Sequence, residues 1–220
     1  MLRRRRDPAL GDEPLFEVKL DEAFLMSSRF TDGEISLAWF GLAPLVAPAF
    51  DIVVGGLGLG YTASTVLANE RVRSLLVIEA LEAVIDWHRR GLVPLGPQLM
   101  ADARCRIVHA DFFERVRAAL EPDAPARRYH ALLVDIDHSP RHLLDPRHAV
   151  FYEPQGLREL LRHLQPAGVF ALWSDELPDE EFLRGLGDVF ASAQAQVVRF
   201  ANPYTGGEAT NTIYVAVAPA

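Results

Sequence analysis

The stretch formed by residues 51–60, DIVVGGLGLG, constrains the fold of this chain more than any other. Residues 51–54 are short and mostly β-branched, which is typical of a buried parallel strand. Four glycines follow it, Gly55, Gly56, Gly58 and Gly60, and residues 61–68 read as a helix. Because glycine has no Cβ atom, such a strand–turn–helix unit lets backbone N–H groups approach a nucleotide-like ligand closely. We therefore expect a ligand site at this turn.

The same alternation of strand and helix continues along the chain. Strands are predicted at 51–54, 74–79, 105–109, 130–135 and 168–173, and helices at 61–70, 80–91, 112–120, 153–164 and 179–191. This pattern predicts a doubly wound, mostly parallel sheet of the Rossmann-like α/β class. Residues 196–200 and 212–217 have no helix between them, so they predict an antiparallel hairpin at the sheet edge. Together these elements match the layout of the S-adenosylmethionine-dependent methyltransferase fold.

The chain is expected to have three parts. Residues 1–14 are expected to be a disordered tail, and residues 15–48 an appendage with a β-hairpin and a helix. Thr31 followed by Glu34 predicts a capping box at the start of that helix. Residues 49–220 form the predicted nucleoside-binding catalytic domain. The apolar character of the N-terminal helix suggests a homodimer.

Composition excludes several classes of function. The net charge of −8 argues against a nucleic-acid partner, which would need a basic face. No apolar run is long enough to span a membrane, and none follows the basic run 3–6 as a signal peptide would require. Cys105 is the only cysteine, so we expect no intrachain disulfide and a cytoplasmic location.

Acidic residues follow several of the predicted strands, where an open parallel sheet binds its ligands. Glu79, about 20 residues past the glycines, can accept hydrogen bonds from two ribose hydroxyls. Asp111 can accept from an adenine amino group while Phe112 covers the ring. Asp135 ends a buried strand, so its carboxylate must either be hydrogen-bonded or take part in ligand binding or catalysis. Each acid taken alone could also be a helix cap or a loop residue.

Three histidines, His138, His142 and His148, raise the alternative of a metal site. Their spacing falls in a loop with two prolines and not on one helical face, so we interpret them as loop histidines and expect no metal. His138 follows the acids directly and can still touch a substrate.

Several motifs, taken in order, resemble the spermidine synthase (polyamine aminopropyltransferase) family. The family motifs are GGGDGG, a strand ending in an acid, DPR, GDA and YDxxxxDSSDP. The corresponding segments here are 55–60, 77–79, 102–104, 110–112 and 129–135, and the likeness extends over residues 51–175. The resemblance implies that Glu79 holds the ribose, that Asp111 holds the adenine, and that Asp135 is the base that receives a proton from the attacking amine.

Departures from the family motifs bear on the reaction. Gly58 replaces the acid of GGGDGG, His138 replaces the second acid with Asp137 one place early, and only Glu34 remains of the N-terminal motif. We expect Glu34, Asp137 and His138 to shape the acceptor's place, Asp137 and His138 to assist Asp135 in catalysis, and Tyr204 to be a lid contact.

The identity of the alkyl-group donor is inferred from Gly58. The loop is expected to offer bare N–H groups that suit a carboxylate, which favours methyl transfer from S-adenosylmethionine to an amine-type acceptor. The alternative is aminopropyl transfer from decarboxylated S-adenosylmethionine to a diamine, with Asp137 in place of the missing acid. A further alternative is a non-catalytic module that binds a nucleoside or a partner.

Overall fold

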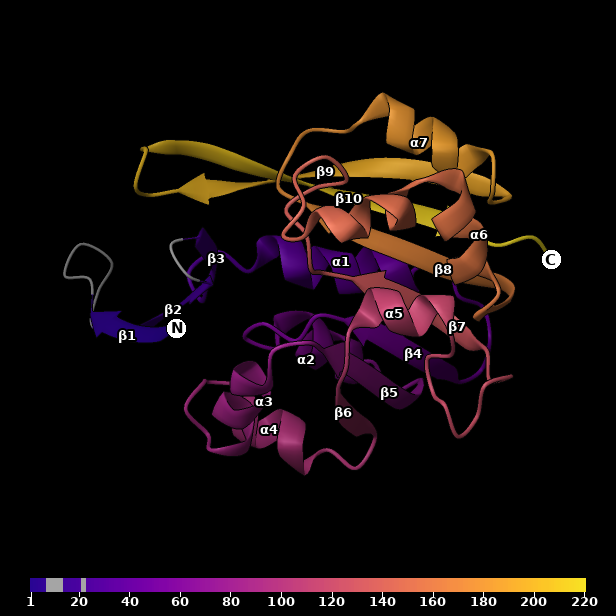
Figure 1. Ribbon diagram of the computed structural model, residues 1–220. Coiled ribbons are helices and arrows are strands. Elements are labelled where there is room, and N and C mark those ends of the chain that lie inside the picture. Colours follow the sequence, from indigo (N-terminus) through magenta and orange to yellow (C-terminus); the bar gives the residue numbers. More distant parts are fainter. Residues whose placement is uncertain (7–13, 21–22) are drawn as a thin grey trace.

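A seven-stranded sheet forms the centre of the molecule in the computed structural model, which describes residues 1–6, 14–20 and 23–220 (Figure 1). The strand order is β6-β5-β4-β7-β8-β10-β9. The strands are β4 (Phe50–Gly55), β5 (Val72–Glu79), β6 (Cys105–His109), β7 (Tyr129–Val134), β8 (Leu164–Ser174), β9 (Ser192–Asn202) and β10 (Gly207–Val217). Strands β4 to β8 pair in parallel, whereas β10 is antiparallel to both β8 and β9. The predicted α/β fold with an antiparallel C-terminal hairpin is confirmed.

Helices cover both faces of this sheet. They are α1 (Asp32–Leu42), α2 (Tyr61–Leu67), α3 (Glu82–Arg89), α4 (Gly96–Ala101), α5 (Phe112–Arg117), α6 (Pro154–Leu161) and α7 (Glu180–Gly187), with a 3-10 segment η2 (Pro146–Tyr152). Strand β4 shows how the two faces arise. Ile52 and Val54 join the core cluster shared with α1 to α4, while Val53 joins the cluster shared with α5 to α7. Burial on both faces explains why this strand is apolar without a break.

A small antiparallel sheet lies beside the main body (Figure 1). Its strands are β1 (Leu2–Arg6), β2 (Pro14–Leu20) and β3 (Ala23–Ser27), in the order β1-β2-β3. A third core cluster joins this sheet to the rest, because Phe16 and Val18 pack with Leu59 of the glycine loop and with Val93. The appendage predicted from residue 15 is therefore fixed at the glycine loop.

The expectation of a disordered tail at residues 1–14 is wrong for residues 2–6. This segment pairs with β2, and Arg3 and Arg5 both form ion pairs with Glu17 of that strand. A run of four arginines looked like a solvated tail, but its alternate side chains Arg3 and Arg5 reach a buried carboxylate on the neighbouring strand. Residues 7–13 of the expected tail lie outside the described residues.

Other elements differ in detail. The expected capping box is absent, because the Thr31 side chain makes no cap hydrogen bond at the start of α1. The short α4 and η2 were not predicted, and β8, β9 and β10 each extend beyond their predicted limits. In the described part of the chain, no helix is both long and apolar enough to cross a membrane.

Candidate active site

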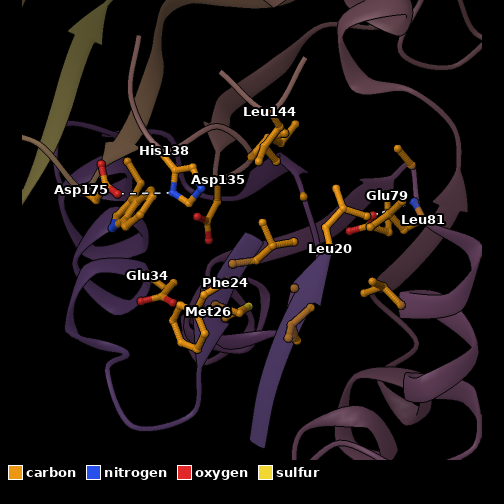
Figure 2. Close-up of a pocket in the computed structure, with 18 of the residues that line it drawn as sticks. Leu20, Phe24, Met26, Glu34, Glu79, Leu81, Asp135, His138, Leu144 and Asp175 are labelled. Carbon is orange, nitrogen blue, oxygen red and sulfur yellow. Dashed lines mark hydrogen bonds and ion pairs between the residues drawn. The ribbon is translucent and has the colours of Figure 1, made fainter. Parts of the chain in front are cut away.

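A cavity of about 610 Å³ lies at the carboxyl ends of β4, β5, β7 and β8 (Figure 2). Ligands of open α/β sheets bind at this edge. Residues of β2 and β3 form an apolar roof over it, which we call the roof: Val18, Leu20, Phe24, Leu25 and Met26. The cavity therefore lies between the acid-bearing strand ends of the main sheet and the small N-terminal sheet.

The glycine turn borders the cavity with only two of its four predicted residues. Gly56 and Gly58 line it, and both have positive φ, 90° and 50°. A Cβ atom at Gly56 would collide with the carbonyl of Asp135, so the close approach of these two loops requires glycine. Gly55 instead packs against the Phe112 ring, and Gly60 precedes α2 outside the cavity lining.

The N–H groups of this turn are largely engaged within the protein, contrary to expectation. The Leu57 N–H donates to Glu79 Oε2 at 2.8 Å, and the Gly60 N–H donates to the Leu57 carbonyl at 2.8 Å. The Leu59 N–H donates to the sulfur of Met26 at 3.1 Å. The loop therefore does not present a row of bare donors to a carboxylate. The expected reason for a preference for intact S-adenosylmethionine is absent.

Glu79 ends β5 inside the cavity and is almost fully buried. Its Oε1 accepts from the Leu81 N–H at 2.7 Å, and its Oε2 from the Leu57 N–H. Burial raises the pKa of Glu79, while the backbone donors, Leu81 first, oppose that shift. Each carboxylate oxygen can accept more than one hydrogen bond, so the carboxylate can still take ribose hydroxyls while it joins two loops.

Of the two residues expected to contact adenine, Asp111 is accessible from the cavity and Phe112 is almost fully buried. Asp111 lines the cavity and also caps α5, because its carboxylate accepts from the Glu114 N–H at 3.0 Å. Phe112 borders the cavity but is only 2% exposed, since its ring packs under Gly55 in the core. Little of that ring is available to cover a base. The apolar side chains of Leu81 and Leu144, which sequence reasoning missed, also line this part of the cavity.

Asp135 and Glu34 are two acids that both line the cavity, and the charge of Asp135 acts on Glu34. The Thr62 hydroxyl donates to Asp135 Oδ2 at 3.0 Å. Burial raises the pKa of Asp135 to about 6, and that hydrogen bond opposes the shift. Burial, and then the charge of Asp135, raise the pKa of Glu34 to about 8. Asp135 is therefore mostly ionised at neutral pH and Glu34 is mostly protonated, which is how two close carboxyls avoid mutual repulsion.

Asp137 does not face the cavity, contrary to its expected role. It is 1% exposed and accepts hydrogen bonds from the Tyr152 hydroxyl at 2.8 Å, the Leu144 N–H at 2.7 Å and His148 Nδ1 at 2.9 Å. These partners all belong to the segment after β7. Asp137 thus anchors that loop, and the acid one place early in the motif is turned inward, because its carboxylate is used by these three donors.

His138 does line the cavity, and it brings in Asp175, which the prediction left out. His138 Nδ1 lies 3.3 Å from Asp175 Oδ2, and the Asp175 N–H donates to the His138 carbonyl at 2.8 Å. Asp175 follows β8 directly, so its place at the sheet edge was visible in the sequence, but the pairing with His138 was not.

Tyr204 lies apart from the cavity lining. It is 51% exposed, its ring meets Phe30 edge-on at a centroid distance of 5.8 Å, and its hydroxyl accepts from Arg5 at 3.4 Å. Its expected lid role stays a prediction. Within residues 1–6, 14–20 and 23–220, no group of three or more histidine, cysteine or acidic residues has a metal-binding arrangement.

Comparison with solved structures identifies the fold. A spermidine synthase in complex with the transition-state analogue AdoDATO matches with a TM-score of 0.69 and 20% identity, over 98% of this chain and 68% of that one. The spermidine synthase of Thermotoga maritima matches with a TM-score of 0.67 and 21% identity, over the same shares. Human methyltransferase-like protein 13 in complex with SAH matches at 0.60 and 20%, over 84% of this chain and 82% of that one.

The fold is therefore the Rossmann-like methyltransferase fold, in the form that spermidine synthases also adopt. The likeness to spermidine synthases extends over nearly the whole chain, including the N-terminal sheet that the motifs did not reach. No protein-family model and no curated protein sequence matches the chain.

Proposed function

We propose that this protein is a transferase that moves an alkyl group from an S-adenosyl nucleoside to an amine-type acceptor. One observation carries the proposal: acids from the ends of β5 and β7, from α1 and from the start of α5 converge on one cavity beside a glycine turn. On the same fold, solved neighbours hold AdoDATO and SAH. The residues of this chain supply the groups that such a nucleoside needs.

The nucleoside end of the cavity is assigned to Glu79 and Asp111. Figure 2 shows Glu79 and Leu81 on one side of the cavity and Asp175 and His138 on the other, with Asp135 between them. With the ribose at Glu79 and the adenine toward Asp111, the sulfonium comes to lie near Asp135. An anion there stabilises the sulfonium and holds an amine in line with the C–S bond.

The acceptor end of the cavity suits a cationic or hydrogen-bond-donating group. Glu34, Asp135 and Asp175 line it, and the one arginine in the cavity lining, Arg147, is bound to Asp145 at 2.8 Å. An ionised Asp135 can accept a hydrogen bond from the amine and keep its proton close as the new C–N bond forms. Because Asp137 is turned inward, the acceptor site rests on Glu34, Asp135, His138 and Asp175.

The alkyl group is methyl or aminopropyl. The sequence favoured methyl transfer from S-adenosylmethionine on the premise of free loop N–H groups, and those groups are engaged. A second candidate, aminopropyl transfer from decarboxylated S-adenosylmethionine, is favoured by the acids at this end of the cavity, which repel a carboxylate and attract an ammonium.

A calorimetric titration tests the proposal directly. We expect binding of methylthioadenosine and of at least one of the two S-adenosyl donors, followed by consumption of that donor when putrescine is added. Asp135→Asn should lower turnover by roughly 10²–10⁴-fold while the affinity for methylthioadenosine changes little, because the amide is nearly isosteric but carries no negative charge toward the amine. Binding without turnover supports the non-catalytic module, and no binding of any of the three nucleosides refutes the proposal.

A further inference from the structure

The pair formed by His138 and Asp175 has an arrangement that goes beyond holding a substrate. His138 Nδ1 faces Asp175 Oδ2 at 3.3 Å, and the two backbones are joined by the hydrogen bond from the Asp175 N–H to the His138 carbonyl. The backbone hydrogen bond thus joins the loop after β7 to the end of β8, and the two side chains approach each other beside it. A carboxylate beside Nδ1 favours the imidazole tautomer that carries its proton on Nδ1.

The other ring nitrogen of His138 is available. In the described part of the chain no hydrogen bond reaches His138 Nε2, and the residue lines the cavity together with Asp135. In the Nδ1–H tautomer, Nε2 carries a lone pair. Figure 2 shows the His138 ring between Asp175 and Asp135, at the acceptor end.

The proposed reaction needs such a lone pair. A primary amine arrives as an ammonium at neutral pH, and an ammonium has no electron pair with which to attack carbon. Asp135, as an anion, attracts the ammonium. Asp135 already accepts a hydrogen bond from the Thr62 hydroxyl, whereas the Nε2 lone pair of His138 is unused among the described residues, so His138 is the better partner for removing the proton.

Resting on the proposed function, we infer that His138 is the base that deprotonates the acceptor ammonium and that Asp175 is its positioning residue. The ammonium proton passes to Nε2, and the resulting imidazolium is stabilised by Asp175. The freed lone pair forms the C–N bond while the C–S bond breaks, and its electron pair stays on sulfur to give a neutral thioether nucleoside. The product leaves as an ammonium that is hydrogen-bonded to Asp135.

The first test reads the tautomer and needs no acceptor. Nitrogen-15 histidine spectra of the protein with methylthioadenosine, recorded where the imidazole is neutral, should show His138 with its proton on Nδ1. His138→Gln identifies the signal by its loss. Asp175→Asn should move the population toward the Nε2–H form that free histidine prefers. A wild-type His138 in the Nε2–H form overturns the inference, whereas methylthioadenosine affinity tests the proposed function separately.

The second test uses turnover of the bound donor with putrescine as the amine. His138→Gln should lower kcat on the order of 10²-fold or more, with methylthioadenosine affinity within a few-fold of wild type. Asp175→Asn should lower kcat less, with KM almost unchanged, and Asp175→Glu should restore part of the loss.

His142 provides the matched control. Its ring lies against His138 with a centroid distance of 4.8 Å, yet it is outside the cavity lining. His142→Gln should therefore keep wild-type turnover. His138→Gln that turns over within a few-fold of wild type, or a His142→Gln loss as large as that of His138→Gln, refutes the role of His138 as the base.

Discussion

At the scale of single residues, the acids at this edge of the sheet make different interactions. Glu79 accepts hydrogen bonds from two backbone N–H groups, and Asp135 accepts one from a hydroxyl. Asp137 accepts its hydrogen bonds from the loop that it anchors. Glu34 is mostly protonated at neutral pH, because burial and Asp135 raise its pKa to about 8. Environment, and not residue type, assigns these roles.

Replacing Glu79 by alanine should weaken the binding of methylthioadenosine by about 1.5–3 kcal/mol, the loss of a charge-assisted pair of hydrogen bonds. Calorimetry measures the affinity. The control is Glu82→Ala on α3, which removes a nearby exposed acid outside the cavity lining. A dissociation constant for Glu79→Ala equal to that of the control would contradict the ribose assignment.

The free energy of unfolding should fall as pH rises through the window set by Glu34. Its pKa is about 8 in the folded state against 4.5 in the unfolded chain, so between these values the native state binds more protons. Glu34→Gln removes the titrating carboxyl. Between pH 5 and pH 8 the free energy of unfolding should therefore fall by about 2–4 kcal/mol less in this variant than in wild type. Urea unfolding at a series of pH values measures the difference, and parallel curves for the two proteins would refute the raised pKa.

At the scale of elements, the segment after β7 forms one wall of the cavity. Asp137 receives three donors from this segment, and two of them, His148 Nδ1 and the Tyr152 hydroxyl, come from η2 itself. The same segment supplies Leu144 and Arg147 to the cavity. A buried acid behind the site thus fixes the wall of the site, without touching a ligand.

Asp137→Asn should lower the free energy of unfolding more than it lowers turnover. Its amide would present a donor to a pocket that already holds three donors, which should cost on the order of 2–4 kcal/mol of unfolding free energy. Asp135→Asn is the matched comparison, with a large loss of turnover and a small loss of stability. Urea unfolding and turnover assays measure both effects. If Asp137→Asn mainly lowers turnover and Asp135→Asn mainly lowers stability, the assignment of Asp137 as the anchor and Asp135 as the active-site acid is wrong.

At the scale of the whole molecule, the small N-terminal sheet closes a cavity that the main sheet leaves open. None of its described side chains belongs to the two large core clusters. Phe16 and Val18 are buried members of the third cluster, and Leu2, Leu25 and Met26 pack against it. Roof residues of β2 and β3 line the cavity, whereas no residue of β1 does. The sheet therefore contributes mainly to the site and less to the central core.

A chain that lacks residues 1–27 should still unfold cooperatively, because both large core clusters remain, but should bind methylthioadenosine at least tenfold more weakly without the roof. A chain that lacks only residues 1–6 keeps β2 and β3 and should bind within a few-fold of wild type. Thermal unfolding and calorimetry on both chains measure these effects. Equal affinity in all three chains would show that the roof plays no part in nucleoside binding.

The sequence by itself determined the central sheet, because local patterns carry the needed information there. Apolar β-branched runs alternate with helical segments, and the observed β4 to β7 differ from their predicted limits by at most two residues. It also determined that Glu79, Asp111 and Asp135 meet at one edge, since the carboxyl ends of parallel strands are neighbours.

Only the tertiary structure decided which way side chains and N–H groups point. Asp137 and His138 are adjacent in sequence, yet one is turned into the protein and the other into the cavity. The donors of the glycine turn are used by Glu79 and by Met26, a residue 33 positions before its partner Leu59. The pairing of His138 with Asp175 likewise joins two strand ends. Such long-range contacts depend on how elements pack, and no local pattern of residues encodes them.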